Sequence, residues 1–390
     1  MDKELLKKLD HLRNEIRRHD HLYYILNTPE ISDQEYDRLF TQLKKLESEN
    51  PHLITPDSPT QRVSGAPLEG FTTVTHSLPM LSMDNTYSPA ELREFDQRVS
   101  KILKLPKDEV VEYVVETKID GVAVSLRYEK GLLTLAATRG DGVRGDDITA
   151  NIRTIPSVPL RLTSPVPQKS AGTLFADQPE DIPDILEIRG EVFMPTAEFD
   201  RINRQREKNG DPLFANPRNA TAGSLKLLDS RLVAQRGLRF LGYALGQVSR
   251  PPDATHYQAM QALCSFSIPV NPHMEPAADI EAVIDICSRW EQKKHSLDYQ
   301  IDGMVVKVNQ FSQQQTLGKT ARAPRWCIAY KFAAERAATL IESISVQVGK
   351  TGELTPVANL TPVEVAGTTI SRASLHNFDE MIRKDVRVGD

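Results

Sequence analysis

The sequence is poor in cysteine and has no long apolar run. Its three cysteines, Cys264, Cys287 and Cys327, are far apart and form no Cys-x-x-Cys pattern, which argues against a disulfide framework and a zinc site. No run approaches the roughly 18 apolar residues that a membrane span needs. The charged N-terminus lacks the apolar core of a secretory signal. We therefore expect a soluble protein of the reducing cytoplasm, without a membrane partner.

A strong charge excess is also missing. The net charge of −5 over 390 residues does not by itself indicate a nucleic-acid-binding protein. Residues 201–239 nevertheless hold nine Lys/Arg against three Asp/Glu. This stretch is either a solvated surface or part of a binding face.

Hydrophobic periodicity predicts the secondary structure. Residues 3–20 and the stretch from Ser32 to Asn50 are expected to be amphipathic helices, the second opened by a capping box of Ser32 and Glu35. Strands are expected at 111–117, 122–128, 132–138, 186–193, 238–245, 301–308 and 328–332, with helices near 196–208, 220–228, 255–264 and 278–294. Four prolines between residues 164 and 184 indicate a surface excursion. Beyond residue 334 we expect short strands only, at 344–348, 354–360 and 361–365.

These patterns predict an α+β protein with three domains. Residues 1–70 form a small helical unit, residues 71–333 a mixed α+β domain, and residues 334–390 the start of a small β-barrel that looks cut short.

The first candidate for chemistry is Lys118, in the run Glu116-Thr117-Lys118-Ile119-Asp120-Gly121. Alternate residues of a strand share a face, so Glu116, Lys118 and Asp120 point the same way. A neutral lysine in this position can attack an electrophilic phosphorus and become attached to a nucleotide. The alternative is a surface lysine flanked by acids, because a Lys-x-Asp-Gly match often arises by chance.

Further strand positions favour nucleotide chemistry. In Asp302-Gly303-Met304-Val305-Val306-Lys307, the side chains of Val305 and Lys307 share a face and suit a base and a phosphate respectively. Lys331 lies in an expected strand, where an ammonium group needs an anion. Glu191 is a strand carboxylate that would take ribose hydroxyls or help a metal, or would simply be a surface acid.

The ordered motifs Lys-x-Asp-Gly, Glu-x-Arg-Gly-Glu-Val and Asp-Gly-x-Val-x-Lys, followed by a strand lysine, resemble the covalent nucleotidyltransferase superfamily of DNA ligases, RNA ligases and mRNA capping enzymes. Within it, the runs at 137–142, 216–225 and 323–326 resemble the bacterial NAD-dependent DNA ligases. The resemblance covers essentially the whole chain. It implies a helical subdomain for the nicotinamide mononucleotide (NMN) half of NAD at 1–70, a nucleotidyltransferase domain of ATP-grasp-like antiparallel sheets at 71–333, and a truncated OB-fold at 334–390.

The resemblance also implies roles for individual residues. Lys118 would be the nucleophile, and Asp120 would orient the 3′ end or the ribose. The residues implied for NAD are Tyr23, Asp33, Tyr36 and Asp37 for NMN, Ser82, Met83, Glu116, Tyr243 and Val305 for adenylate, Glu191 for ribose, and Arg139, Arg218, Lys307 and Lys331 for phosphates. Met83 departs from the usual leucine, and Lys226 and Lys294 stand where members usually have arginine. No protein metal-ligand set is expected.

The implied reaction transfers AMP from NAD to Lys118 with Mg²⁺, then to the 5′-phosphate of nicked double-stranded DNA, which the 3′-hydroxyl finally seals. We expect a monomer that adenylates itself but seals nicks poorly, since the family's zinc module and other DNA-clamping domains lie beyond this chain. Two alternatives stay open. One is an ATP-dependent ligase or capping enzyme, and the other is a non-catalytic nucleotide- or DNA-binding module.

Overall fold

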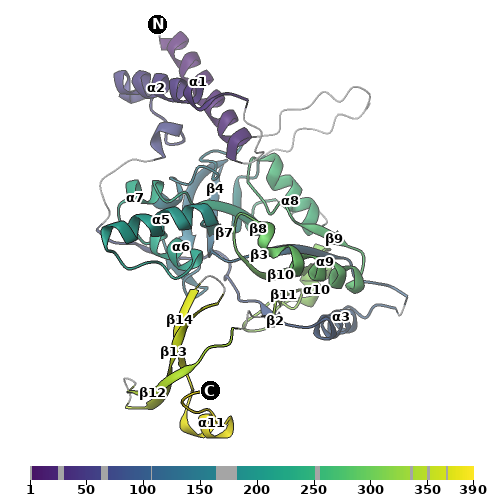
Figure 1. Ribbon diagram of the computed structural model, residues 1–390. Helices are drawn as coiled ribbons and strands as arrows, with labels where there is room; N and C mark the ends of the chain where they lie inside the picture. Colours follow the sequence, from purple (N-terminus) through teal and green to yellow (C-terminus); the bar gives the residue numbers. More distant parts are fainter. Residues whose placement is uncertain are drawn as a thin grey trace. The chain divides into compact units, whose positions relative to one another are not determined.

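A computed structural model describes residues 2–24, 30–62, 69–106, 108–163, 182–250, 255–333, 337–348, 352–365 and 368–390 (Figure 1). The chain divides into two compact units, one of Met1–Asn209 and Pro217–Phe332, the other of Gly210–Asn216 and Ala333–Asp390. The finer division into three domains stays a prediction. In the described part of the chain, no helix combines the length and apolar character needed to cross a membrane.

The first unit begins with two helices, α1 (Asp2–Tyr24) and α2 (Asp33–Glu49). Their leucine-rich stripes meet in a small core that includes Leu9, Ile16 and Leu43. The expected capping box is confirmed, because Ser32 accepts from the Glu35 backbone and Glu35 accepts from the Ser32 backbone. Helix α2 ends where the expected proline stop begins a 3-10 turn, Pro51–Leu53.

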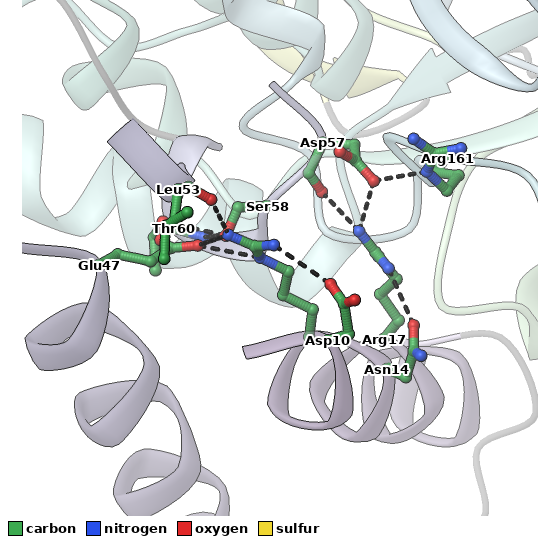
Figure 2. A network of polar contacts seen from close by, with 10 residues as sticks. Asp10, Asn14, Arg17, Glu47, Leu53, Asp57, Ser58, Thr60 and Arg161 are labelled. Atoms are coloured by element: carbon green, nitrogen blue, oxygen red, sulfur yellow. Dashed lines mark hydrogen bonds and ion pairs between the residues drawn. The ribbon is translucent and has the colours of Figure 1, made fainter. Parts of the chain in front are cut away.

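A buried ion pair joins the two helices to the segment that follows them (Figure 2). Nη2 of Arg13 lies 2.7 Å from Oε1 of Glu47 and donates to the Leu53 carbonyl at 2.7 Å. Both charged side chains are almost completely hidden from solvent. Removing either partner would leave an uncompensated buried charge, so this pair fixes how α1 and α2 pack.

Asp57 connects the helices to the rest of the first unit (Figure 2). Its Oδ2 lies 2.5 Å from Nη2 of Arg17 on α1 and 2.5 Å from Nε of Arg161. Nearby, Arg62 donates to the carbonyls of Arg153, Ile155 and Val158. Arginine contacts therefore help to attach the helical segment to the rest of the first unit.

A five-stranded sheet has the order β2-β11-β10-β3-β9. Its strands are β2 (Asp84–Thr86), β11 (Cys327–Lys331), β10 (Ile301–Val308), β3 (Tyr113–Ile119) and β9 (Glu275–Ala277). All neighbours are antiparallel except β2 and β11, which are parallel. One face packs in a hydrophobic core with α3 (Pro89–Leu103), α9 (Ile280–Lys293) and α10 (Phe311–Leu317). The alternation of strand side chains leaves the opposite face for polar residues.

A second, four-stranded antiparallel sheet has the order β5-β4-β7-β8. Its strands are β5 (Leu132–Thr138), β4 (Val122–Glu129), β7 (Ile185–Phe193) and β8 (Arg239–Val248), all at or near their expected positions. Lys130 and Gly131, which join β4 to β5, both have positive φ, as a tight hairpin turn requires. The expected excursion at 164–184 lies almost wholly outside the described residues, which resume at 182.

Further helices and a two-stranded ribbon lie in the described part of the first unit. The helices are α4 (Thr149–Ile152), α5 (Thr196–Asn209), α6 (Pro217–Leu225), α7 (Ser230–Ala234) and α8 (His256–Ser265), and the ribbon pairs β1 (Thr73–Thr75) with β6 (Arg144–Asp146). The helix expected near 220–228 is α6, and it begins at Pro217 because proline suits the first turn of a helix. Helix α3 was not expected, although Ser88 caps it and Pro89 opens it.

The second unit contains a three-stranded antiparallel sheet of β12 (Ile341–Val348), β13 (Leu354–Val365) and β14 (Thr368–Ser374). The two strands expected at 354–360 and 361–365 form one strand, whose pairing with β14 shifts between Asn359 and Val363. Among the described residues these strands form an open sheet rather than a closed barrel. The expectation of strands alone was wrong, because α11 (Phe378–Arg383) follows, capped by Asn377.

Candidate functional site

The run that contains Lys118 joins the two large sheets. Strand β3 ends at Ile119 and belongs to the five-stranded sheet, whereas β4 begins at Val122 and belongs to the four-stranded sheet. Only Asp120 and Gly121 connect them. A Cβ at Gly121 would lie 2.2 Å from the Val192 carbonyl oxygen, so this crossing requires glycine. Lys118 thus lies beside the joint between the sheets.

Strand register aligns the candidate residues in rows on one face of the five-stranded sheet. Gly303 of β10 lies opposite Lys118 of β3 on one side and Lys331 of β11 on the other. One row along, Val305 lies between Glu116 and Ala329. The same register forms the following row from Val114, Lys307 and Cys327. Opposed residues of neighbouring strands share a face, so the strand containing Lys118, the Asp-Gly-x-Val-x-Lys strand and Lys331 present the candidate residues together.

Asp302 connects the two lysines that flank Gly303. Its carboxylate oxygens lie 2.9 and 3.0 Å from Nζ of Lys118, and its Oδ2 lies 3.7 Å from Nζ of Lys331. A Cβ at Gly303 would lie 2.1 Å from the Tyr330 carbonyl, so the strands can approach there only with glycine. The sequence analysis quoted Asp302 within its motif but gave it no role, because the partner of a carboxylate depends on strand register.

Glu116 and Lys307 form a second, completely buried ion pair. Nζ of Lys307 lies 2.6 Å from Oε1 of Glu116 and donates to the Tyr243 carbonyl at 2.6 Å. The same nitrogen lies 5.4 Å from the centre of the Tyr243 ring. Because Tyr243 is on β8, this contact brings the two sheets together. Oε2 of Glu116 is buried and has no hydrogen-bond partner among the described residues.

The four-stranded sheet contributes a carboxylate and an arginine. Glu191 on β7 is half-buried, and Arg139 follows β5 and is exposed. Burial raises the pKa of the Glu191 carboxyl to about 8, and the positive charges of Lys118, Arg218 and Arg139 oppose the rise. These charge interactions place Glu191 in the same electrostatic neighbourhood as Lys118. The pairing of Asp120 Oδ1 with Nη1 of Arg218 at 2.9 Å adds helix α6 to this group.

Two other expected positions lie at the edge of the five-stranded sheet. Ser82 is exposed and Met83 is half-buried, immediately before β2. Sδ of Met83 lies 3.3 Å from Sγ of Cys327, a residue in the row of Lys307. The side chain of Lys226, by contrast, is exposed, and its Nζ lies 3.8 Å from Oδ2 of Asp146.

The four residues expected to bind NMN lie on α1 and α2. Tyr23 and Asp33 are in these helices, but their side chains are outside the described part of the structure. Tyr36 packs against the helical core and donates its hydroxyl to Asp20 at 2.7 Å, while Asp37 is exposed. The structure therefore gathers the adenylate candidates around the two sheets and places the NMN candidates on the helices.

His256 is a residue that the sequence analysis missed. It begins α8, is 2% exposed, and its Nε2 lies 3.3 Å from Nζ of Lys307. Burial, followed by the charge of Lys307, lowers the pKa of His256 well below its ordinary value, so the ring is neutral at physiological pH. Because a lone histidine near the start of a helix carries no motif, nothing in the sequence pointed to this contact.

Comparison with protein families explains this constellation of residues. Residues 68–335 match the model of the NAD-dependent DNA ligase adenylation domain. The chain belongs to the NAD-dependent DNA ligase family. Residues 2–64 match the DNA ligase-like, N-terminal NAD⁺-binding domain, and residues 338–390 match the NAD-dependent DNA ligase OB-fold domain.

Named relatives support the same assignment. The chain is 49% identical over 388 residues to a DNA ligase of Thermotoga maritima, in an alignment that covers 100% of this chain and 53% of the relative. It is 48% identical over 384 residues to a DNA ligase of Geobacter metallireducens, covering 98% of this chain and 55% of the relative. The chain therefore spans about half the length of these relatives.

The comparison of structures is less informative. A solved structure titled mycobacterial DNA ligase D complexed with ATP and MES aligns over 79% of this chain and 75% of that chain, with 13% identity and a TM-score of 0.33. At this score the likeness supports no conclusion about the site.

Proposed function

We propose that this chain performs the adenylation half of NAD-dependent DNA ligation, with Lys118 as the nucleophile. One observation supports the proposal: Lys118 lies at the joint of two sheets, level with Lys331 across Gly303 and one row from the buried Glu116–Lys307 pair. The arrangement has the polarity of an adenosine phosphate, with a base at one end and phosphates at the other.

The base end is formed by Glu116, Val305 and Tyr243. The unpartnered Oε2 of Glu116 would accept a hydrogen bond from the exocyclic amine of adenine, while Val305 and the Tyr243 ring would pack on the faces of the base. Lys307 suggested a phosphate contact from sequence alone. Its ammonium group is buried against Glu116, so we propose that it serves the base end instead.

The reaction begins when Lys118 loses its ammonium proton, for which the Asp302 carboxylate is the adjacent acceptor. The Nζ lone pair then forms a bond to the α-phosphorus of NAD. The phosphorus–oxygen bond to NMN breaks, its electrons remain on the departing NMN phosphate, and AMP stays on Lys118. Holding amine and phosphorus in one geometry supplies much of the rate.

The remaining site residues would bind the rest of adenylate. Lys331 is the cation across Gly303 from Lys118, and Arg139 and Arg218 are exposed guanidinium groups suited to bidentate phosphate contacts. Glu191 would take the ribose hydroxyls, and Asp120 would orient the ribose or the DNA 3′ end. Ser82 and Met83 would line the adenylate from the segment just before β2.

Mg²⁺ fits this chemistry without a protein cage. The described residues contain no cluster of three metal-ligating side chains, and Mg²⁺ is commonly held by substrate phosphates, water and one or two carboxylates. Asp120 and Glu191 are the site carboxylates that would help hold such an ion. When bound, the ion would neutralise charge that develops on the phosphate oxygens.

The helices α1 and α2 would recognise the NMN half of NAD. Tyr23 and Tyr36 offer aromatic rings for the pyridinium, and Asp33 and Asp37 offer carboxylates for its charge and ribose. The match of this region to a NAD⁺-binding domain supports the assignment. It also favours NAD over ATP as the AMP donor.

The later steps need nicked double-stranded DNA. AMP on Lys118 would pass to the 5′-phosphate of the nick, and the 3′-hydroxyl would then displace it. The chain spans about half the length of these relatives, and the DNA-joining steps are proposed for it on the strength of the family alone. Its three cysteines are free thiols, which agrees with action in the reducing cytoplasm, and we propose that it works as a monomer.

Intact mass spectrometry after incubation with Mg²⁺ and either NAD or ATP tests the proposal. NAD should add the mass of AMP, and Lys118→Ala should abolish the addition. An adduct formed with ATP in preference to NAD would select an ATP-dependent ligase or capping enzyme. Reversible binding of NAD without any adduct would select a non-catalytic module.

A further inference from the structure

His256 is held in a defined position beside the buried pair of Glu116 and Lys307. Its backbone N–H donates to the carbonyl of Asn309 at 2.8 Å, which anchors the start of α8 to the residue after β10. Its ring lies edge-to-face with that of Phe311, with the ring centres 6.1 Å apart. The backbone hydrogen bond holds His256 where its Nε2 lies 3.3 Å from the Lys307 ammonium.

This arrangement gives each of the three N–H groups of Lys307 an acceptor. They are Oε1 of Glu116 at 2.6 Å, the carbonyl of Tyr243 at 2.6 Å and Nε2 of His256 at 3.3 Å. His256 is neutral, because burial and the Lys307 charge lower its pKa, so Nε2 can act as an acceptor. The ammonium has no need to contact the second carboxylate oxygen.

The second oxygen of Glu116 consequently remains available. Glu116 is 3% exposed, and its buried Oε2 has no partner among the described residues. A buried carboxylate oxygen without a donor is costly, so its position points to a ligand donor. A buried N–H group without an acceptor is unfavourable, so without His256 the Lys307 ammonium would turn toward both carboxylate oxygens of Glu116.

We propose that His256 is a positioning residue for nucleobase selection: by accepting one proton of Lys307, it keeps Oε2 of Glu116 free for the exocyclic amine of adenine. The inference rests on the proposed adenylation function and names a determinant of its specificity. His256 does not touch the nucleotide. It acts through Lys307 on the direction of one carboxylate oxygen.

The test compares NAD with nicotinamide hypoxanthine dinucleotide, in which oxygen replaces the exocyclic amine. The readout is kcat/KM for formation of Lys118-AMP or Lys118-IMP, measured by intact mass with the whole chain. The unsubstituted chain should prefer NAD by about 10- to 100-fold, the range of one charge-assisted hydrogen bond. His256→Leu should lower this preference by about fivefold or more, mainly through slower use of NAD.

Two further variants separate positioning from packing. His256→Gln places an amide oxygen near the position of Nε2 and should restore most of the preference for NAD. Phe311→Leu disturbs the packing of the same ring but leaves the acceptor in place, so its preference should match that of the unsubstituted chain. If His256→Leu does not fold, His256→Met is a second variant that lacks the nitrogen acceptor.

The outcomes distinguish failure of the role proposed for His256 from failure of the proposed adenylation function. If the unsubstituted chain forms no adduct with NAD, the proposed function fails. If it forms the adduct but the leucine and methionine variants keep its preference for NAD, the role of His256 is overturned. Loss of preference in Phe311→Leu to the same extent would also overturn it, because packing alone would then explain the effect.

Discussion

Lys118 and Asp302 form a two-point ion pair across neighbouring strands, with Nζ 2.9 and 3.0 Å from the two carboxylate oxygens. Both side chains are partly exposed, at 19% and 30%. Because an ammonium group cannot attack phosphorus, this contact must be released or its proton transferred before adenylation. For Lys118 as the proposed nucleophile, Asp302 is both the partner that orients the side chain and the proton acceptor in contact with it.

Replacing Asp302 with asparagine should slow lysine adenylation about 100-fold, because the variant loses the acceptor and the charge that aligns Lys118. Single-turnover formation of the adduct with saturating NAD measures this effect. Asp298→Asn is a matched control, since Asp298 is 61% exposed and pairs with Arg239 away from the lysine. A rate within about threefold of the unsubstituted chain would remove Asp302 from the chemistry.

Glu191 should make the stability of the protein depend on pH. Its pKa is raised to about 8 in the folded chain by burial, so folding favours its protonated form. The stabilisation from this group is present below the pKa of the unfolded carboxyl, about 4.3, and is lost as the pH rises through about 8. Thermal unfolding at pH 6 and pH 9 should show a smaller pH-dependent loss for Glu191→Gln than for the unsubstituted chain. Equal losses would contradict the prediction.

Gly303→Ala should destabilise the five-stranded sheet. Its Cβ would lie 2.1 Å from the Tyr330 carbonyl, which forces β10 and β11 apart. We expect a loss of about 1–3 kcal/mol in the free energy of unfolding, measured by denaturant titration. Gly70→Ala is the control, because no atom lies within 4 Å of its added Cβ. Similar stabilities for the two variants would show that the strands adjust without cost.

Asp57→Ala should loosen the helical segment without harming the sheets. It removes the carboxylate that Arg17 and Arg161 share, so both guanidinium groups lose their ion pair. Hydrogen exchange should rise in α1 and α2 while strands β3 and β10 remain protected. Asp10→Ala, which removes an exposed carboxylate 3.4 Å from Arg13, should leave both regions unchanged. Faster exchange in β3 would show that Asp57 stabilises more than the docking of the helices.

The sequence was sufficient to predict the long strands and the capped helix, because those patterns are local. Alternation placed Glu116 and Lys118 on one face, and register confirms that Val305 and Lys331 share it. Gly121 and Gly303 of the motifs also proved necessary, because a side chain at either position would collide with a backbone carbonyl. For these elements, local rules and the fold agree.

The residues that sequence analysis missed act through contacts between distant segments. His256 meets Lys307 only because α8 is anchored beside the end of β10. Asp302 meets Lys118 through strand pairing 184 residues apart in the chain. Helix α11 was missed for another reason, since one capped turn and a half carries too little periodicity to distinguish it from a loop.

The two-residue crossing between β3 and β4 has a mechanical consequence. Two residues span at most about 7 Å, so the sheets cannot separate at this point by more than a few ångströms, whereas their angle can still change. Lys118 lies next to this crossing, so a change in the angle between the sheets would move it less than residues farther from the crossing. A change in this angle would therefore shift other groups of the site relative to Lys118, while Lys118 itself would stay nearly in place.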